Sequence, residues 1–288
     1  MTDKSTSIWA ASPSRRWRFH LWRGARCMEG GDLRGARRHF LAAYREAPSE
    51  PLVCLAWGRE VQRSGDAVEA EKLLRQAFEA DPDLEVAGLH LARLLGLGLG
   101  RPGEAEELLD QLAARHEETP AALILRAELR LLDPSEHEEA RRLLDEAARL
   151  GAEEAAVRMG LARVLNAEGV SRSRAGDHHR ALFALKRAGD LDPNWAGPLI
   201  NRGAILERLG QVAQAQREYR QALRIEPKNP VALFNLADSL RRQGDRDSAE
   251  RLFRRLLEVE PSYPGGEKGL RSLLDRGPGV TGEPPLHP

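Results

Sequence analysis

The sequence predicts an all-α fold: a solenoid of about seven helix-turn-helix repeats followed by a capping helix. Three observations predict it. A motif recurs every 34 residues, each copy holds two amphipathic helical patterns separated by a glycine-containing turn, and a proline ends the copy. Repeats of this length stack on their neighbours and bury one continuous core, so we expect a binding surface rather than an enclosed catalytic pocket.

The repeat is clearest in residues 196–229 and 230–263. Five pairs of equivalent residues stand 34 positions apart: Gly203 and Ala237, Gly210 and Gly244, Ala215 and Ala249, Tyr219 and Phe253, and Pro227 and Pro261.

Each of these positions has a physical role. Small residues at positions 8 and 20 of the repeat, the first on its first helix and the second on its second helix, let the two helices approach closely. Glycine at the turn tolerates the positive φ of a helix end, and the polar residue after it can cap the next helix. Proline near position 32 ends the second helix, because it has no N–H group to donate.

The same register runs back through the chain. It gives seven units: 17–50, 51–84, 85–120, 121–154, 155–195, 196–229 and 230–263. The third unit replaces its turn with "GLGLGRPGEAEE", and the fourth has Glu128 where a small residue belongs. The fifth carries seven extra residues, close to two helical turns, which predicts a long first helix from about Glu153 to Ala175.

With this spacing of small residues, glycine and proline, the sequence resembles the tetratricopeptide repeat family. The resemblance implies a right-handed α-α superhelix spanning residues 15–275, with first helices that line a concave groove for extended or helical peptides. We expect a capping helix at 265–275, and disordered ends at 1–14 and 276–288, because both ends are polar or rich in Pro and Gly.

Composition argues against several functions. The chain has 44 basic and 44 acidic residues, so it has no net charge that would favour nucleic acid. Cys27 and Cys54 are expected as reduced, inward-facing thiols, and His178-His179 lacks further ligands at metal-binding spacing. We therefore expect no enzymatic activity, no cofactor and no metal, and, since no apolar run approaches a membrane span, a cytoplasmic protein.

Side chains at the groove positions implied by the resemblance are the candidate binding residues. Asparagines there can hold a peptide backbone through an amide that both donates and accepts, or can bond neighbouring helices instead. Arginines at position 13 suit acidic peptides or a terminal carboxylate, although a helix C-terminus also favours a cation. The candidate groove comprises Asn166, Arg174, Ile200, Asn201, Arg208, Phe234, Asn235, Asp238 and Arg242.

The main hypothesis is a non-enzymatic scaffold or adaptor that binds a segment of another protein in this groove. The Lys and Asn constellation of chaperone-binding family members is missing, since Leu21, Ala25, Leu55 and Arg59 stand at its positions. One alternative is a nucleic-acid or membrane-surface binder that uses a basic, aromatic N-terminal helix, and another is a peptide-sensing regulator. The basic patch would comprise Arg15, Arg16, Arg18, Arg23 and Arg26.

Overall fold

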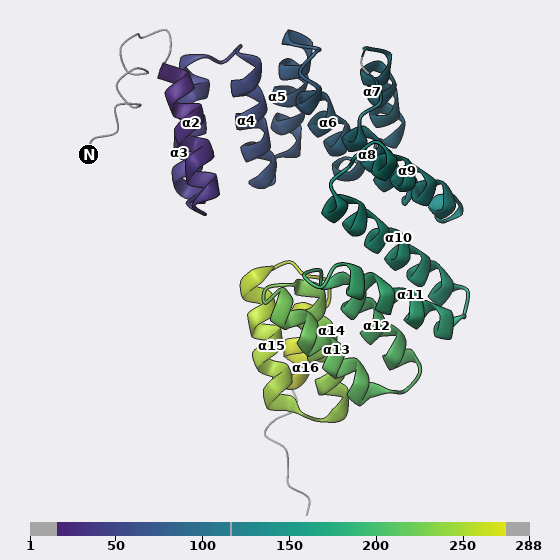
Figure 1. Cartoon of the computed structure of the whole chain (residues 1–288). Coiled ribbons are helices and arrows are strands. Elements are labelled where there is room, and N and C mark those ends of the chain that lie inside the picture. The colour runs from purple at the N-terminus through teal and green to yellow at the C-terminus, as the bar shows by residue number, and fades with distance from the viewer. Residues whose placement is uncertain (1–15, 116, 275–288) are drawn as a thin grey trace, which may run out of the picture. The chain divides into compact units, whose positions relative to one another are not determined.

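The computed structural model describes residues 16–115 and 117–274. Every regular element in this part of the chain is helical, which confirms the all-α repeat fold (Figure 1). The predicted disordered ends, and the last residue of the predicted capping helix, lie outside the described residues.

The described helices fall into two compact units. The first unit covers residues 16–132 and 142–153, and the second covers 133–141 and 154–274. The helix α9 (His137–Arg149), preceded by the 3₁₀ turn η3 (Pro134–Glu136), contributes to both units.

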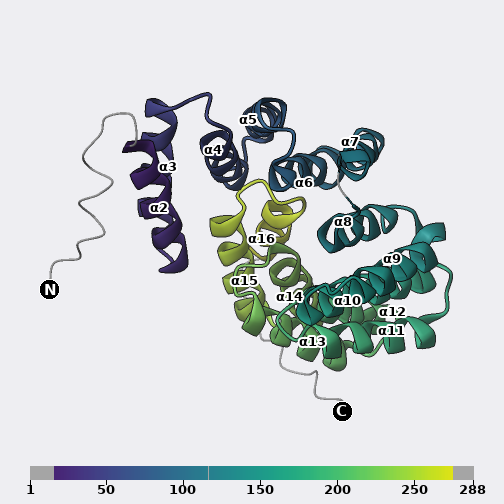
Figure 2. The same cartoon turned by 45° about the horizontal axis from the view of Figure 1, so that its top comes forward.

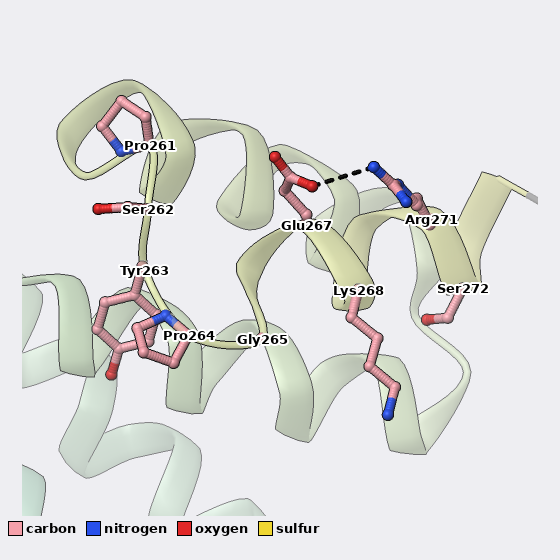
Figure 3. A pocket seen from close by; sticks show the side chains of 9 residues that line it. All are labelled: Pro261, Ser262, Tyr263, Pro264, Gly265, Glu267, Lys268, Arg271 and Ser272. Carbon is pink, nitrogen blue, oxygen red and sulfur yellow. Dashed lines mark hydrogen bonds and ion pairs between the residues drawn. The ribbon is translucent and has the colours of Figure 1, made fainter.

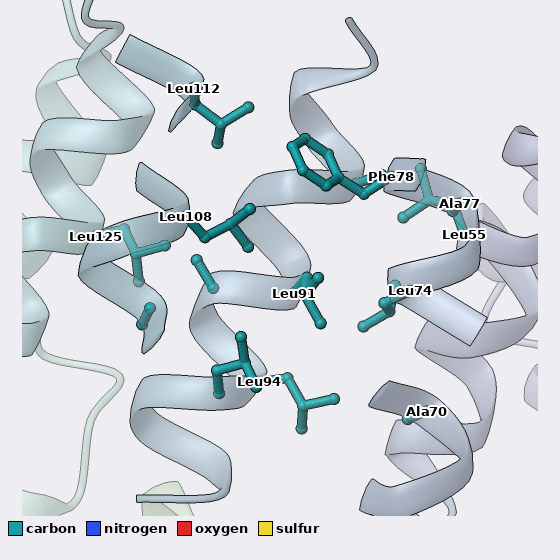
Figure 4. Close-up of a cluster of buried hydrophobic side chains, with 14 of the residues drawn as sticks. Leu55, Ala70, Leu74, Ala77, Phe78, Leu91, Leu94, Leu108, Leu112 and Leu125 are labelled. Carbon is teal, nitrogen blue, oxygen red and sulfur yellow. The ribbon is translucent and has the colours of Figure 1, made fainter. Parts of the chain in front are cut away.

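The first unit contains three helix pairs and one further helix. They are α2 (Arg16–Glu29) with α3 (Leu33–Glu46), α4 (Pro51–Arg63) with α5 (Ala67–Ala80), α6 (Glu85–Arg93) with α7 (Pro102–Arg115), and α8 (Pro120–Arg130). Its core is a cluster of leucine and alanine side chains with Phe78, contributed by α4 to α8 (Figure 4). Cys54 is fully buried in this cluster and Cys27 is half-buried; both thiols are free.

The second unit contains α10 (Glu154–Arg174) with α11 (His178–Leu191), α12 (Gly197–Arg208) with α13 (Val212–Ile225), and α14 (Pro230–Gln243) with α15 (Arg246–Val259). The capping helix α16 (Gly266–Leu274) packs on α15 (Figure 2). Leu273 of this helix is buried. Consecutive helices pack on one another, and first helices of neighbouring pairs also touch: α10 with α12, and α12 with α14.

The close approach of paired helices depends on the predicted small residues. Gly203 is buried, and a Cβ at this position would lie 2.4 Å from the Tyr219 ring. Gly169 faces Leu185 and Gly24 faces Phe40 in the same way. Since Tyr219 is fully buried, these glycines leave the space that the large second-helix side chain fills.

The turns follow the prediction with one difference. Gly210 has φ +74° and Gly244 has φ +88°, so both occupy the left-handed region that favours glycine. The Asp245 carboxylate accepts a hydrogen bond from the Ser248 N–H and caps α15, whereas Gln211 makes no side-chain cap for α13. The Gln211 side chain is longer than that of an aspartate, which suits the cap geometry less well.

Two departures from the repeat pattern in the sequence correspond to irregular segments of the structure. The predicted long helix is present as α10, which has 21 residues. In the third sequence repeat, 85–120, α6 continues into a π-helical segment, η2 (Leu94–Gly98), in place of the regular turn. Gly96 in this segment is buried under Leu129 of α8, so the added backbone fills space between helices of the first unit.

Candidate functional site

The first helices of the second unit make side-chain contacts with a constant offset of 35 residues. The Asn201 Nδ2 group donates to Asn166 Oδ1 at 2.9 Å, between α12 and α10. One step along the stack, Arg242 Nη2 donates to Glu207 Oε2 at 3.1 Å, between α14 and α12. A stack of 34-residue units brings such residues together, because each first helix lies beside the next one in nearly the same register.

A cavity of about 140 Å³ opens on this face between α10 and α12. Three of the predicted groove residues line it: Arg174, Asn201 and Arg208. The other lining residues are Val170, Ser173, Ala204 and Ile205. The cavity thus combines two guanidinium groups, an amide and a hydroxyl with short apolar walls.

The charges around this cavity are not balanced by acids. No carboxylate lines it, and the structure gives no ion pair for Arg174 or Arg208 within the described residues. Arg208 Nη1 reaches only the Ser173 hydroxyl, at 3.4 Å. Guanidinium groups have five N–H donors and stay charged, so both can bind an anion.

Asn201 both bonds the neighbouring helix and lines the cavity. Its hydrogen bond to Asn166 uses one of the two N–H groups of the amide, so for this pair the structure shows the helix-to-helix contact. One N–H and the carbonyl oxygen have no partner in the described residues. Asn235 occupies the equivalent place on α14, is half-buried, and makes no side-chain hydrogen bond in that part of the chain.

Ile200 was predicted to line the groove, but the structure places it in the core. Its side chain is only 7% exposed and belongs to the core cluster with Leu236 and Tyr219, so it stabilises the helix stack and offers no surface to a ligand. Phe234 is half-buried against Phe253 and Tyr263, with ring centroids 6.0 and 5.4 Å away. Both residues are apolar; Ile200 packs within the core cluster, and Phe234 packs on α15 and on the loop after it.

The predicted row of arginines is not uniform. Arg242 is paired with Glu207 at 3.1 Å and with Asp238 at 3.1 Å, so both its charge and that of Asp238 are compensated. Arg208 contacts Ser173, whereas Arg242 contacts Glu207, because Ser173 precedes Glu207 by one repeat length. Sequence reasoning missed Ser173; comparing the residues that contact position 13 along the 34-residue register would have found it.

The predicted basic patch lies on α2 in the first unit. Arg16, Arg18 and Arg23 are exposed, and Arg26 pairs with Glu29 at 3.0 Å. The Arg18 guanidinium lies 5.0 Å from the centroid of the Trp17 ring, and Trp22 is 45% exposed. Arg15 lies outside the described residues. The helix therefore presents cations and aromatic rings together.

A second cationic group, which sequence reasoning did not identify, lies on α4 and α6. His90 is half-buried near Arg59, Arg63 and Arg93, and burial, followed by the repulsion of these arginines, lowers the pKa of His90 to about 4. Arg63 pairs with Glu60 at 2.6 Å, and Arg93 pairs with the buried Glu128 at 2.7 Å. Within the described residues, Arg59 is therefore the cation of this group that contacts no carboxylate.

A wider hollow of about 620 Å³ lies between the loop after α15 and α16 (Figure 3). Tyr263, Lys268 and Arg271 are among its lining residues, and Arg271 pairs with Glu267 at 3.0 Å. It contains none of the predicted groove residues and is lined mainly by exposed side chains. We therefore take the cavity between α10 and α12 as the candidate site.

Among the residues that the structure describes, no group of three or more His, Cys, Asp or Glu side chains is arranged to hold a metal ion. No helix within 16–115 or 117–274 combines the length and the apolar character needed to cross a membrane.

The stacked helix pairs define a helical-repeat protein, and comparison with known sequences gives its family. A family model described as "Tetratricopeptide repeat" matches residues 62–129 and 206–264. These two stretches of the chain are therefore tetratricopeptide repeats, as the repeat spacing indicated. Repeats of this family generally form non-catalytic scaffolds for protein–protein interaction. No curated protein matches the chain in sequence.

Solved structures have the same fold. A tetratricopeptide repeat protein from Parabacteroides merdae is similar with a TM-score of 0.59 and 16% identity, covering 90% of this chain and 98% of that one. A chain of the APC/C hetero-tetramer Cut9-Hcn1 has a TM-score of 0.59 and 16% identity, covering 87% and 48%. PilF of Pseudomonas aeruginosa has a TM-score of 0.50 and 18% identity, covering 78% and 96%. At these identities the likeness concerns the fold alone.

Proposed function

We propose that this protein is a non-enzymatic adaptor that binds a segment of another protein on the first helices α10, α12 and α14. The observation that supports this most is the cavity between α10 and α12, because Arg174, Asn201 and Arg208 line it together. Those three side chains supply hydrogen-bond donors and positive charge beside a small apolar wall, which is the chemistry of a polypeptide-binding surface.

The neighbouring surface extends the proposed site. Asn235 on α14 is half-buried and has no side-chain hydrogen-bond partner in the described part of the chain, so its amide can bond the backbone of a bound segment. Because Asn201 and Asn235 stand one repeat apart, an extended segment lying across α12 and α14 would meet both amides.

Recovery of partners from a lysate of the native host tests this function. The full chain is compared with Arg208→Gln and with Arg224→Gln, an exposed cation on the second helix α13 that serves as the matched control. We expect a defined protein to be recovered with the wild type and with Arg224→Gln, but not with Arg208→Gln. Equal recovery with all three chains would overturn the proposed site.

The α2 surface supports a second, alternative function, in which an anionic membrane or nucleic acid binds the basic aromatic helix. The exposed Trp22 and the arginines around it favour this alternative. It predicts strongly salt-dependent binding to anionic vesicles or to nucleic acid that is lost with Arg18→Gln and Arg23→Gln, and retained with Arg208→Gln.

A further inference from the structure

We propose that the cavity between α10 and α12 is a subsite for a carboxylate group of the bound polypeptide. Arg208 is the residue that would pair with it, and Arg174 and Asn201 line the same space. This assignment rests on the proposed function, because it names the chemical group that enters the cavity of the proposed binding surface.

The protein itself shows what occupies the equivalent place one repeat later. Arg242 on α14 reaches across to Glu207 on α12, whose side chain is 15% exposed. The same step between α12 and α10 brings Arg208 to Ser173, which is 6% exposed and has no charge. A carboxylate therefore faces Arg242 between α14 and α12, whereas none faces Arg208 between α12 and α10, beside the cavity.

Nearby acids do not replace the missing carboxylate. Glu207 is adjacent to Arg208 in sequence, but its carboxylate accepts from Arg242 and lies 3.5 Å from the Tyr219 hydroxyl. No acid lines the cavity, and Arg174 forms no ion pair within the described residues. Both arginines stand near helix C-termini, where the backbone dipole is favourable, yet their N–H groups remain available for hydrogen bonds.

The size and the walls of the cavity favour a carboxylate. A volume of about 140 Å³ is several times the space that one water molecule occupies in the liquid, roughly 30 Å³. Val170, Ala204 and Ile205 give apolar walls that suit the methylene groups carrying a side-chain carboxylate. A guanidinium group can bind a carboxylate through two parallel hydrogen bonds, which adds orientation to charge attraction.

The carboxylate could belong to an internal Asp or Glu or to the C-terminus of the bound chain. An array of short random peptides separates the two sources: one half carries free C-termini and the other half carries amidated C-termini. The labelled full chain is the probe. Preference for Asp or Glu in amidated peptides would assign an internal carboxylate, and preference for free ends without acidic residues would assign the terminal one.

Ser173→Glu is the decisive variant, because it supplies from within the chain the carboxylate that Glu207 supplies to Arg242. Its matched control is Ser171→Glu, which adds the same charge to α10 two residues away, outside the cavity lining. We expect Ser173→Glu to weaken binding of carboxylate-bearing peptides about tenfold or more, and Ser171→Glu to change it little. Thermal melting followed by circular dichroism checks that both variants fold, and Arg208→Gln should give the same loss if Ser173→Glu does not fold.

The outcomes separate this inference from the function on which it rests. If the wild type binds peptides without preference for a carboxylate, and Ser173→Glu binds them equally well, the carboxylate subsite is overturned while peptide binding stands. If the wild type binds no peptide and Arg208→Gln still recovers the host partner, the proposed binding surface is wrong, and the carboxylate subsite is overturned with it.

Discussion

Arg242 on α14 forms a 3.1 Å ion pair with Glu207 on α12, whereas Arg208, one repeat earlier, meets the hydroxyl of Ser173 at 3.4 Å. The two arginines occupy the same position of the repeat, 34 residues apart. One of them is therefore neutralised by the neighbouring helix and the other is not, and this difference coincides with the cavity.

The first prediction concerns the free energy of unfolding when a carboxylate is placed beside Arg208. Ser173→Glu and Arg208→Gln, made singly and together, should show a favourable coupling of about 0.2–1 kcal/mol, as expected for a partly exposed ion pair. Urea unfolding of the four chains measures it. A coupling of zero would show that a carboxylate at position 173 does not reach Arg208.

The second prediction concerns the contact between Gly203 and Tyr219. Gly203→Ala places a Cβ 2.4 Å from the Tyr219 ring, which is fully buried, so we expect a loss of about 1–3 kcal/mol in the free energy of unfolding. Gly189→Ala on α11 is the control, because its Cβ would meet only Pro198 at 3.9 Å. The control should gain about 0.4–1 kcal/mol by reducing the entropy of the unfolded chain. Equal unfolding midpoints for the two variants would contradict the packing account.

These residues also show how far the sequence predicts the structure. Gly203, Ala215 and Gly210 follow from the repeat register, because backbone approach and positive φ leave few choices of residue there. The register also places Asn201, Arg208 and Arg242 on one face of the helix stack. It does not predict that Ile200 is buried, since adjacent groove and core positions differ by a small rotation about the helix axis.

The cavity itself could not be predicted from the sequence. Its walls depend on the distance and rotation between α10 and α12, and α10 departs from the repeat length by seven residues. Whether an arginine is paired depends on the side chain 35 residues earlier, which a pattern within one repeat does not include.

The third prediction concerns the pH dependence of stability in the first unit. The pKa of His90 is lowered from 6.5 to about 4, first by burial and then by Arg59, Arg93 and Arg63. The unfolded chain therefore binds a proton at a higher pH than the folded chain does. The contribution of neutral His90 is fully present above about pH 6.5 and is lost as the pH falls toward 4. His90→Gln should remove a loss on the order of 1 kcal/mol between pH 7 and pH 5, allowing for partial exposure.

Urea unfolding at several pH values measures this effect. The wild type should lose stability on acidification more steeply than His90→Gln. His179, which is exposed on α11, provides the control, and His179→Gln should keep the wild-type slope. Parallel curves for the wild type and His90→Gln would show that His90 does not have a lowered pKa.

The fourth prediction concerns Glu128, the residue that stands where the repeat pattern expects a small side chain. Its side chain is 7% exposed and pairs with Arg93 at 2.7 Å, between α8 and α6. Arg93→Met removes this ion pair from a buried carboxylate, and we expect a loss of about 1–3 kcal/mol in the free energy of unfolding. Adding Glu128→Met should recover part of that loss, because the buried charge is then removed. Chemical denaturation of the single and double variants measures this, and additive losses would contradict the pairing.

The central claim is that a partner polypeptide lies on α10, α12 and α14 with a carboxylate at Arg208. Site-specific photo-crosslinking in the native host tests it most directly, with a benzophenone amino acid in place of Asn235, which stands on α14 one repeat after Asn201, and in place of Ala213, which is exposed on α13. The account predicts a defined crosslinked partner from position 235 and none from position 213, with the product lost on adding Ser173→Glu and retained on adding Ser171→Glu. Equal products from both positions, or a product from position 235 that survives Ser173→Glu, would contradict it.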